Sequence, residues 1–448
     1  MRSREGPCEP TTEQLSIRFL ETEKIFTDRN SHPLPPPTYR VLPPEQLEAL
    51  FFANSETSAR QVGNANISTA TFQAYKDENE DRVFVHEFAK GTVFGILDGH
   101  SGSQISEHAS RILPLMLEKA ISEAMESWDH STDLSTRRAF LSNVFKGTFA
   151  DYDSSIMKPV MQIFKLKPWQ DWTEDEIKKV YWDGDGAPES RELARRAGRG
   201  ATALVGFLTK EGGHLTVANL GDSQAFTGTR NYAQDDTRSI YSRQITTEHN
   251  GSNSIEVARV EAEHPGEISL FSKFGRLLKI IAVTRAFGDF FFKLDPVFCR
   301  RILAEAHHCP VPIPMLEEWP RTHNTPPYIS NIPDVTHHSL SKGDIVVFAS
   351  DGLGDASQLG AFAKHEKASL FVELTAGQPK EVWSEKLGHD LMVKKDEGNT
   401  AVRLMKNVLF GTDQRKMARE LALEIPPEAT YPFVQDDISV ICVEFGMM

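Results

Sequence analysis

The sequence predicts an α+β protein, in which short β-strands alternate with α-helices from about residue 68 onward. Apolar runs of strand length bounded by turn residues are typical of buried strands, and four of them stand out: residues 92–97, 215–219, 345–350 and 439–445. Apolar residues recur at helical spacing in two longer segments: residues 103–125 and 399–409. We find no internal repeat, so a repeat array is not expected.

Length and charge exclude several classes of protein. The chain has 448 residues, of which 40% are hydrophobic and 25% charged, as in ordinary globular proteins. Its 49 Lys and Arg residues are outnumbered by 63 Asp and Glu residues, which gives a formal net charge of −14. An acidic chain is a poor candidate for binding nucleic acid or an anionic membrane, and the apolar runs are far shorter than a membrane span. We therefore expect neither partner.

The cysteines and the first residues indicate the compartment. The four cysteines lack a CxxC spacing and are too sparse for a disulfide framework, which favours an intracellular protein. Acidic residues at Glu5, Glu9 and Glu13 argue against a transit peptide, because such peptides are poor in acids. We expect the cytoplasm or the nucleus.

The chain divides into an extension and a larger domain. Residues 1–60 contain a proline cluster and one short helical stretch at 45–52. Residues 61–448 are expected to form a single catalytic domain. Two polar excursions, near residues 164–200 and 228–275, are expected to be insertions in it.

Acidic residues lie at the ends of the predicted strands. Asp98, Asp222 and Asp351 each follow a predicted strand within three residues, whereas Asp436 lies three residues before the last one. If that last strand runs antiparallel to the strand ending at Asp351, both carboxylates fall on the same edge of the sheet. The acidic pair at residues 80–81 precedes a further strand-like run.

Carboxylates crowded on one edge repel each other and raise one another's pKa values, so cations must sit among them. Hard divalent ions with oxygen ligands fit such a set. The glycine after Asp98 would let the backbone approach an ion and offer its carbonyl. Because no Cys or His cluster has zinc spacing, we expect Mg²⁺ or Mn²⁺.

A paired metal site has a recognised chemistry. Two ions about 4 Å apart can hold and deprotonate a bridging water and stabilise an in-line displacement at phosphorus. His100, two residues after Asp98, is placed to protonate the leaving alkoxide. A single Asp-Gly pair is usually a turn, and a single histidine is usually structural, so the hypothesis depends on the ordered set.

Taken in order, these segments resemble the type 2C metal-dependent protein serine/threonine phosphatases. Seven stretches match the family's motifs in the family's order: residues 80–82, 94–102, 200–203, 217–223, 283–289, 349–355 and 435–440. Three further stretches most resemble the family's pyruvate dehydrogenase phosphatase catalytic subunits: residues 248–250 with 263–265, 285–293 and 325–329. This subgroup makes the mitochondrion the alternative compartment.

The resemblance implies a fold and a ligand set. The fold would be a four-layer αββα arrangement, in which a β-sandwich of two antiparallel sheets is flanked by helices and the metal ions lie at one end. Asp98 would bridge two ions, the Gly99 carbonyl and Glu80 or Asp81 would complete one shell, and Asp351 and Asp436 would hold the other ion.

Other positions are matched to supporting roles. His100 matches the proposed general acid, Asp222 and Asp355 match residues that can hold a third, weaker ion, and Thr202 and Asp289 match supporting residues. Residues 228–275 would correspond to a flap beside the active site.

Three positions depart from the family's pattern. Lys76 stands where the family often has an arginine that grips the phosphate, and lysine offers a point charge instead of a bidentate fork. Gly354 replaces a bulky residue, and Gln224 replaces an arginine. None of the three removes a metal ligand.

The leading hypothesis is therefore a metal-dependent phosphatase that acts on phosphoserine and phosphothreonine in phosphoprotein substrates. A catalytically silent scaffold or binding module is the alternative, and a hydrolase of small phosphorylated metabolites is a third hypothesis. A regulatory subunit is left open.

Overall fold

The computed structural model describes the following residues: 14–16, 26–28, 33–34, 38–40, 42–73, 78–128, 132–183, 186–230, 240–306, 325–392, 398–424, 429–430 and 436–446. Statements about what is absent from the structure refer to these residues.

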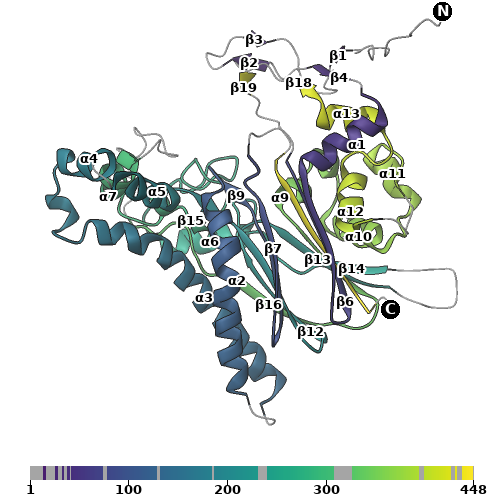
Figure 1. Ribbon diagram of the computed structural model, residues 1–448, viewed down its shortest axis with the longest axis horizontal. Coiled ribbons are helices and arrows are strands. Elements are labelled where there is room, and N and C mark those ends of the chain that lie inside the picture. The colour runs from purple at the N-terminus through teal and green to yellow at the C-terminus, as the bar shows by residue number, and fades with distance from the viewer. Residues whose placement is uncertain are drawn as a thin grey trace, which may run out of the picture.

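Two antiparallel sheets form the centre of the molecule (Figure 1). The larger sheet has the strand order β14 (Ile240–Gln244), β13 (Gln224–Arg230), β17 (Asp344–Ala349), β20 (Ile438–Phe445), β6 (Ala65–Phe72) and β5 (Ser55–Val62). The smaller one has the order β16 (Asp334–Ser339), β12 (His214–Leu220), β11 (Ala203–Thr209), β8 (Gly91–Leu97) and β7 (Arg82–Phe88). The predicted α+β sandwich is confirmed.

The apolar runs in the sequence are strands buried on both faces. In β17, Val346 and Phe348 pack between the sheets, while Ile345, Val347 and Ala349 pack against helices. Successive side chains of a strand point to opposite faces, so two buried faces require an apolar residue at every position. Across the interface the rings of Phe348 and Phe94 lie 5.3 Å apart between centroids.

Helices cover the two outer faces of the sandwich (Figure 1). The smaller sheet is covered by α2 (Gln104–Glu126) and α3 (Leu134–Ile163), and α2 buries every fourth residue from Ile105 to Ile121. The larger sheet is covered by α1 (Pro44–Ala53), α10 (Lys364–Ala376), α12 (Thr400–Leu409) and α13 (Gln414–Leu421). This gives the four predicted layers.

The remaining elements are short or peripheral. They comprise α4 (Glu174–Trp182), α5 (Ala187–Ala197), α6 (Ser254–Glu263), α7 (Pro296–Phe298), α9 (Asp351–Gly354), α11 (Glu381–Leu387), β1 (Gln14–Ser16), β2 (Phe26–Asp28), β3 (Pro33–Leu34), β4 (Thr38–Arg40), β9 (Gly99–His100), β10 (Gly200–Ala201), β15 (Phe287–Gly288), β18 (Leu423–Glu424) and β19 (Ala429–Thr430). No described helix is both long and apolar enough to cross a membrane.

The segments expected to be an extension and an insertion contain regular structure. β5 pairs with β6 along its whole length, and α1 buries Leu47 and Phe51 against the helices beyond the larger sheet. The folded unit therefore begins before residue 60. Within residues 164–200, α4 and α5 pack together, and α5 packs on α3 at one end of the molecule (Figure 1).

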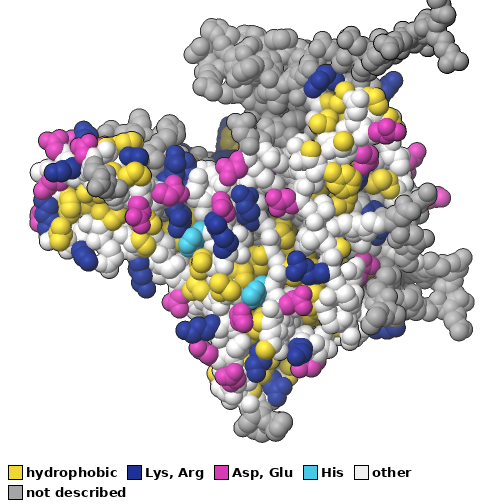
Figure 2. All heavy atoms as spheres, in the orientation of Figure 1, with side chains coloured by type: hydrophobic (Ala, Val, Ile, Leu, Met, Phe, Trp, Pro, Cys, Tyr) yellow, Lys and Arg dark blue, Asp and Glu magenta, His cyan; other side chains and the backbone are white. Residues whose placement is uncertain are grey.

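The molecular surface mixes both signs of charge. On the face drawn in Figure 2, Lys and Arg side chains lie among Asp and Glu side chains, and hydrophobic side chains gather near the middle of the face.

Packing between the sheets should dominate stability. Phe348 is fully buried, so replacing it with alanine should lower the free energy of unfolding by about 3–5 kcal/mol, because the cavity cannot refill. Chemical denaturation measures this change. The same substitution at Phe274, whose side chain is 79% exposed, should cost less than about 0.5 kcal/mol. Equal losses would contradict the proposed core.

Candidate metal centre

The strand ends bring the predicted carboxylates to one edge of the sandwich. β17 and β20 are antiparallel, so Asp351, two residues after β17, lies at the same end as the segment before β20, which contains Asp436. Two hydrogen bonds join them there, from Ser350 N to Ser439 O at 2.9 Å and from Ser439 N to Ser350 Oγ at 2.8 Å. The antiparallel arrangement expected from the sequence is confirmed.

The second sheet contributes Asp98 from the end of β8. Thr202 donates its N–H to the Asp98 carbonyl at 2.8 Å, which fixes the backbone of the acidic residue. The two segments meet at a pocket of about 300 Å³ lined by Glu80, Asp98, Gly99, His100, Ser101, Thr202, Asp222, Arg276, Ile280, Ile281, Ala282, Val283, Asp289, Phe292, Asp351 and Asp436. Most of the predicted site residues thus share one pocket.

Of the predicted residues that the structure describes, two do not line this pocket: Asp81 and Asp355. Lys76 lies outside the described residues. Asp355 does not line the pocket, and its Oδ1 accepts hydrogen bonds from Lys367 Nζ at 3.2 Å and from Gln224 Nε2 at 3.3 Å. Asp81 is buried behind the pocket, with 3% of its surface exposed.

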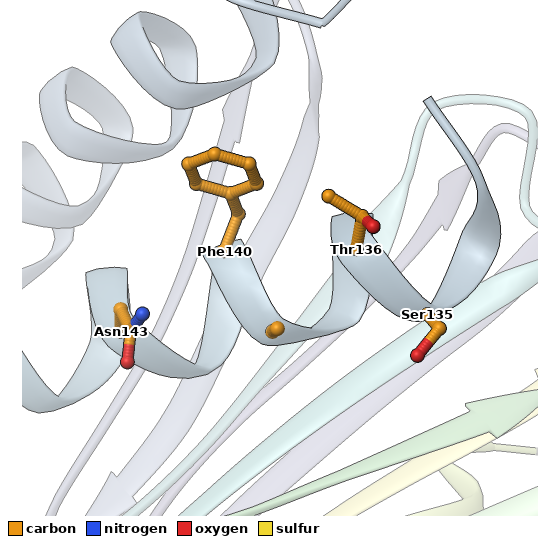
Figure 3. A pocket seen from close by; sticks show the side chains of 5 residues that line it. Ser135, Thr136, Phe140 and Asn143 are labelled. Carbon is orange, nitrogen blue, oxygen red and sulfur yellow. The ribbon is translucent and has the colours of Figure 1, made fainter. Parts of the chain in front are cut away.

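The pocket on α3 offers a useful comparison. It is lined by Ser135, Thr136, Ala139, Phe140 and Asn143, and Figure 3 shows four of these side chains projecting from one helix. None of them ionises near neutral pH or is a strong metal ligand. This pocket therefore offers no candidate metal centre.

The glycines of the Asp-Gly pairs allow acidic segments to approach each other. A Cβ on Gly99 would lie 2.4 Å from the Glu80 carbonyl, and a Cβ on Gly352 would lie 2.0 Å from the Asp437 carbonyl. The sequence suggested that the glycine after Asp98 serves contact with an ion. The structure supplies a further cause: each glycine is needed where a second acidic segment packs against the first.

Burial and crowding disfavour ionisation of these carboxylates. Burial, followed by the charges of Asp351 and Asp81, raises the pKa of Asp98 well above its usual range. Burial, followed by neighbouring carboxylates, also raises the pKa of Asp81 and of Asp222 to about 8 and the pKa of Asp351 to about 6. A bound cation would reverse this effect.

The residues present fit hard divalent ions. The charge of Asp351 raises the pKa of Asp98, and a cation between the two carboxylates would relieve this repulsion. Asp81 Oδ2 and Asp222 Oδ1 are buried without a hydrogen-bond partner among the described residues. Among the residues that the structure describes, no three His, Cys, Asp or Glu side chains are arranged so that they could together hold a metal ion. The donor set is composed of oxygens, as Mg²⁺ and Mn²⁺ prefer.

His100 is paired with Asp289, whose role the sequence left unspecified. His100 Nε2 lies 2.7 Å from Asp289 Oδ2. Burial alone would lower the pKa of His100, but the charge of Asp289 and its hydrogen bond raise it above the usual value. Asp289 has a left-handed backbone conformation with φ of 52°, and its N–H is bonded to the Arg199 carbonyl at 2.7 Å.

Gly200 makes this pair possible. It pairs with His100 on one side and with Gly288 on the other in a small sheet of β9, β10 and β15. A Cβ at this position would lie 2.1 Å from His100 Nε2 and 2.3 Å from Asp289 Oδ2.

His249 is a buried residue to which the sequence assigned no role at the site. Its Nδ1 accepts from Gly221 N at 3.1 Å, so the proton of the neutral ring is on Nε2, which lies 3.1 Å from Asp334 Oδ2. Asp334 in turn accepts from Arg285 at 2.8 Å. These contacts fix the backbone beside Asp222. In the sequence, residues 248–250 stand out only by their resemblance to the pyruvate dehydrogenase phosphatases, because Gly221 and Asp334, the partners of His249, are distant along the chain.

The Gly354 and Gln224 departures are two sides of one contact. A Cβ on Gly354 would lie 2.8 Å from the Gln224 side chain, so the glutamine fills the space that a larger residue at position 354 would need. Asp437, next to Asp436, is also buried, and its Oδ2 accepts from Glu80 N at 2.8 Å. This contact positions Glu80 at the pocket.

A two-sheet sandwich with acidic strand ends gathered at one edge is suited to hydrolysis assisted by divalent metal ions. A family model described as protein phosphatase 2C matches residues 65–358, more than half of the chain. The chain belongs to the protein phosphatase 2C family and is a protein serine/threonine phosphatase, which acts on phosphoproteins. The family is generally dependent on Mg²⁺ or Mn²⁺.

Named relatives are consistent with this family. The chain is 27% identical to human "[Pyruvate dehydrogenase [acetyl-transferring]]-phosphatase 1, mitochondrial", over 80% of this chain and 73% of the relative. It is 26% identical to a protein phosphatase 2C homolog of Schizosaccharomyces pombe, over 79% and 73%. A solved serine-threonine phosphatase 2C from Toxoplasma gondii shares the fold, with a TM-score of 0.50, 15% identity and coverage of 87% and 99%.

Replacing Gly200 with alanine should separate His100 from Asp289, because the added Cβ occupies their space. We expect kcat for a phosphopeptide to fall by about 100-fold, within the range of general acid–base catalysis. Steady-state kinetics with Mn²⁺ measures this change.

Gly147→Ala is the matched control, because a Cβ there meets nothing within 4 Å. It should retain wild-type kcat and raise stability slightly. A Gly200→Ala protein with wild-type kcat would contradict the importance of the pair.

Proposed function

We propose that this phosphatase hydrolyses phosphoserine and phosphothreonine through a centre of two Mg²⁺ or Mn²⁺ ions held by Asp98, the Gly99 carbonyl, Asp351 and Asp436, with Glu80 or Asp81. The observation that carries the proposal is the convergence of carboxylates from the strand ends of both sheets on one pocket. Their raised pKa values favour protons unless cations are present.

The positions of the residues suggest their roles. Asp98 lies within electrostatic reach of Asp81, Asp222 and Asp351, which suits a ligand shared between two ions. When bound, the ions would make water a competent nucleophile at neutral pH and offset the charge of the phosphoryl group. Thr202 would be a positioning residue, because its N–H holds the backbone carbonyl of Asp98.

His100 would donate a proton to the leaving serine or threonine oxygen. Its Nε2 is engaged with Asp289, so the proton would pass from Nδ1. Asp289 would keep the ring oriented and favour the protonated form. Both side chains line the pocket.

A third ion is less well supported than the first two. Asp222 lines the pocket, but Asp355 is already engaged by the Lys367 ammonium and by Gln224. A cation bound between Asp222 and Asp355 would have to displace or tolerate Lys367. We therefore propose two ions as the working complement.

The domain organisation and the compartment are also proposals. We infer that the catalytic unit extends from about residue 42 to the end of β20, with residues 164–200 and 228–275 as insertions. The human pyruvate dehydrogenase phosphatases 1 and 2, to which the chain is similar, are named as mitochondrial proteins, which supports the alternative compartment over the cytoplasm or nucleus.

Removing the metal ligands tests the proposed centre. We expect Mn²⁺-dependent phosphate release from a phosphothreonine peptide in the wild type, a loss on chelation, and at least a 1,000-fold loss of kcat/KM in Asp98→Asn and in Asp351→Asn, on the order expected when a group essential to catalysis is removed. Calorimetry with Mn²⁺ should show weaker binding in both variants.

Three outcomes separate the hypotheses. A folded wild-type protein that binds Mn²⁺ without turning over phosphopeptides or small phosphates would favour the silent scaffold. Turnover of phosphorylated metabolites in preference to phosphopeptides would favour a hydrolase of small phosphorylated metabolites. Retained activity in Asp98→Asn would refute the ligand assignment.

A further inference from the structure

The pocket contains more negative charge than two divalent ions can offset. Six carboxylates line it, from Glu80, Asp98, Asp222, Asp289, Asp351 and Asp436. A phosphorylated side chain brings a further charge of about −1.5 to −2 near neutral pH. Productive binding therefore needs additional positive charge directed at the phosphoryl oxygens.

Arg276 supplies such a charge from the loop that closes one side of the pocket. Among the described residues that line the pocket, it is the single Lys or Arg. Its side chain is exposed, and its guanidinium donates a hydrogen bond from Nη1 to the Ile280 carbonyl at 2.7 Å. A guanidinium has five N–H donors, so donors remain for an anion.

The loop is rigidly anchored beneath Arg276. Leu277 and Leu278 are 0% and 2% exposed, within the core on the α2–α3 side of the molecule. Leu278 N donates to Leu270 O at 2.7 Å, and Arg276 N donates to Ser272 Oγ at 3.1 Å. The backbone of Arg276 is therefore held in place before any substrate arrives, which lowers the entropic cost of binding.

We propose that Arg276 binds the phosphoryl group of the substrate and sets the affinity for it. This inference rests on the proposed function. The family's phosphate-gripping arginine is replaced here by Lys76, which offers a single point of charge. Arg276 provides the pocket with a guanidinium that can bind phosphate through two donors. It comes from a different segment of the chain, directly after residues 228–275, which are expected to form a flap.

Arg276→Gln, Arg276→Lys and a matched control test the proposal. Lys273→Gln removes one positive charge from the same loop, at a residue that does not line the pocket and whose ammonium lies 4.8 Å from the Phe274 ring centroid. The readouts are KM and kcat with a phosphothreonine peptide and with p-nitrophenyl phosphate, and calorimetric binding of inorganic phosphate to the Mn²⁺-loaded protein.

Phosphate recognition predicts a specific pattern. Arg276→Gln should weaken binding of inorganic phosphate and raise KM for both substrates by at least tenfold, with a smaller change in kcat, and Arg276→Lys should recover part of the loss. Lys273→Gln should stay within twofold of wild type.

Several results would overturn the proposal. Unchanged phosphate binding in Arg276→Gln would do so, as would a higher KM for the peptide alone, because Arg276 would then contact the peptide chain. An equal effect in Lys273→Gln would indicate a general field effect. Phosphate binding is measured without turnover. A wild-type protein that binds phosphate but is inactive would therefore contradict the proposed function and leave the role of Arg276 in phosphate binding intact.

Discussion

Repulsion among buried carboxylates is the constraint on which the rest of this structure depends. Asp81 and Asp222 are buried and Asp98 and Asp351 are half-buried, so their charges are poorly solvated, and their mutual repulsion raises their pKa values. The chain tolerates this because the acidic residues lie at the ends of strands whose interiors are packed on both faces. The packed core holds this edge together despite the repulsion. Binding of cations would reduce the repulsion and so raise the free energy of unfolding.

Close approach of backbone segments is the second requirement, and glycines meet it. Gly99 admits the Glu80 segment, Gly352 admits the Asp437 segment, and Gly200 leaves room for the contact between His100 and Asp289. In each case a Cβ would lie within 2.4 Å of a neighbouring heavy atom. These three glycines therefore determine how closely the acidic segments, and His100 and Asp289, approach each other.

Local patterns predicted much of the fold and of the acidic pocket. Strands buried on both faces leave continuous apolar runs, and acidic residues at their ends are visible beside them, so Asp98, Asp351 and Asp436 could be grouped once an antiparallel pairing was assumed. His249 and Arg276 could not be assigned in this way. His249 acts through Gly221, 28 residues earlier, and through Asp334, 85 residues later. Arg276 reaches the pocket only because buried leucines anchor its loop.

The positions that depart from the family's pattern show how one contact can appear as two anomalies. Gln224 and Gly354 look like separate losses in the sequence, yet the glutamine occupies the space above the glycine. The same arrangement directs Gln224 Nε2 to Asp355, where the Lys367 ammonium also binds. Asp355 thus has a tethered cation of its own, and Lys367 is further held by the Gly354 carbonyl at 2.5 Å. An ion that competes for Asp355 must displace an ammonium that the fold already holds in place. The fold therefore balances the charge of this outer carboxylate, whereas the proposed metal centre would balance the charges of the inner ones.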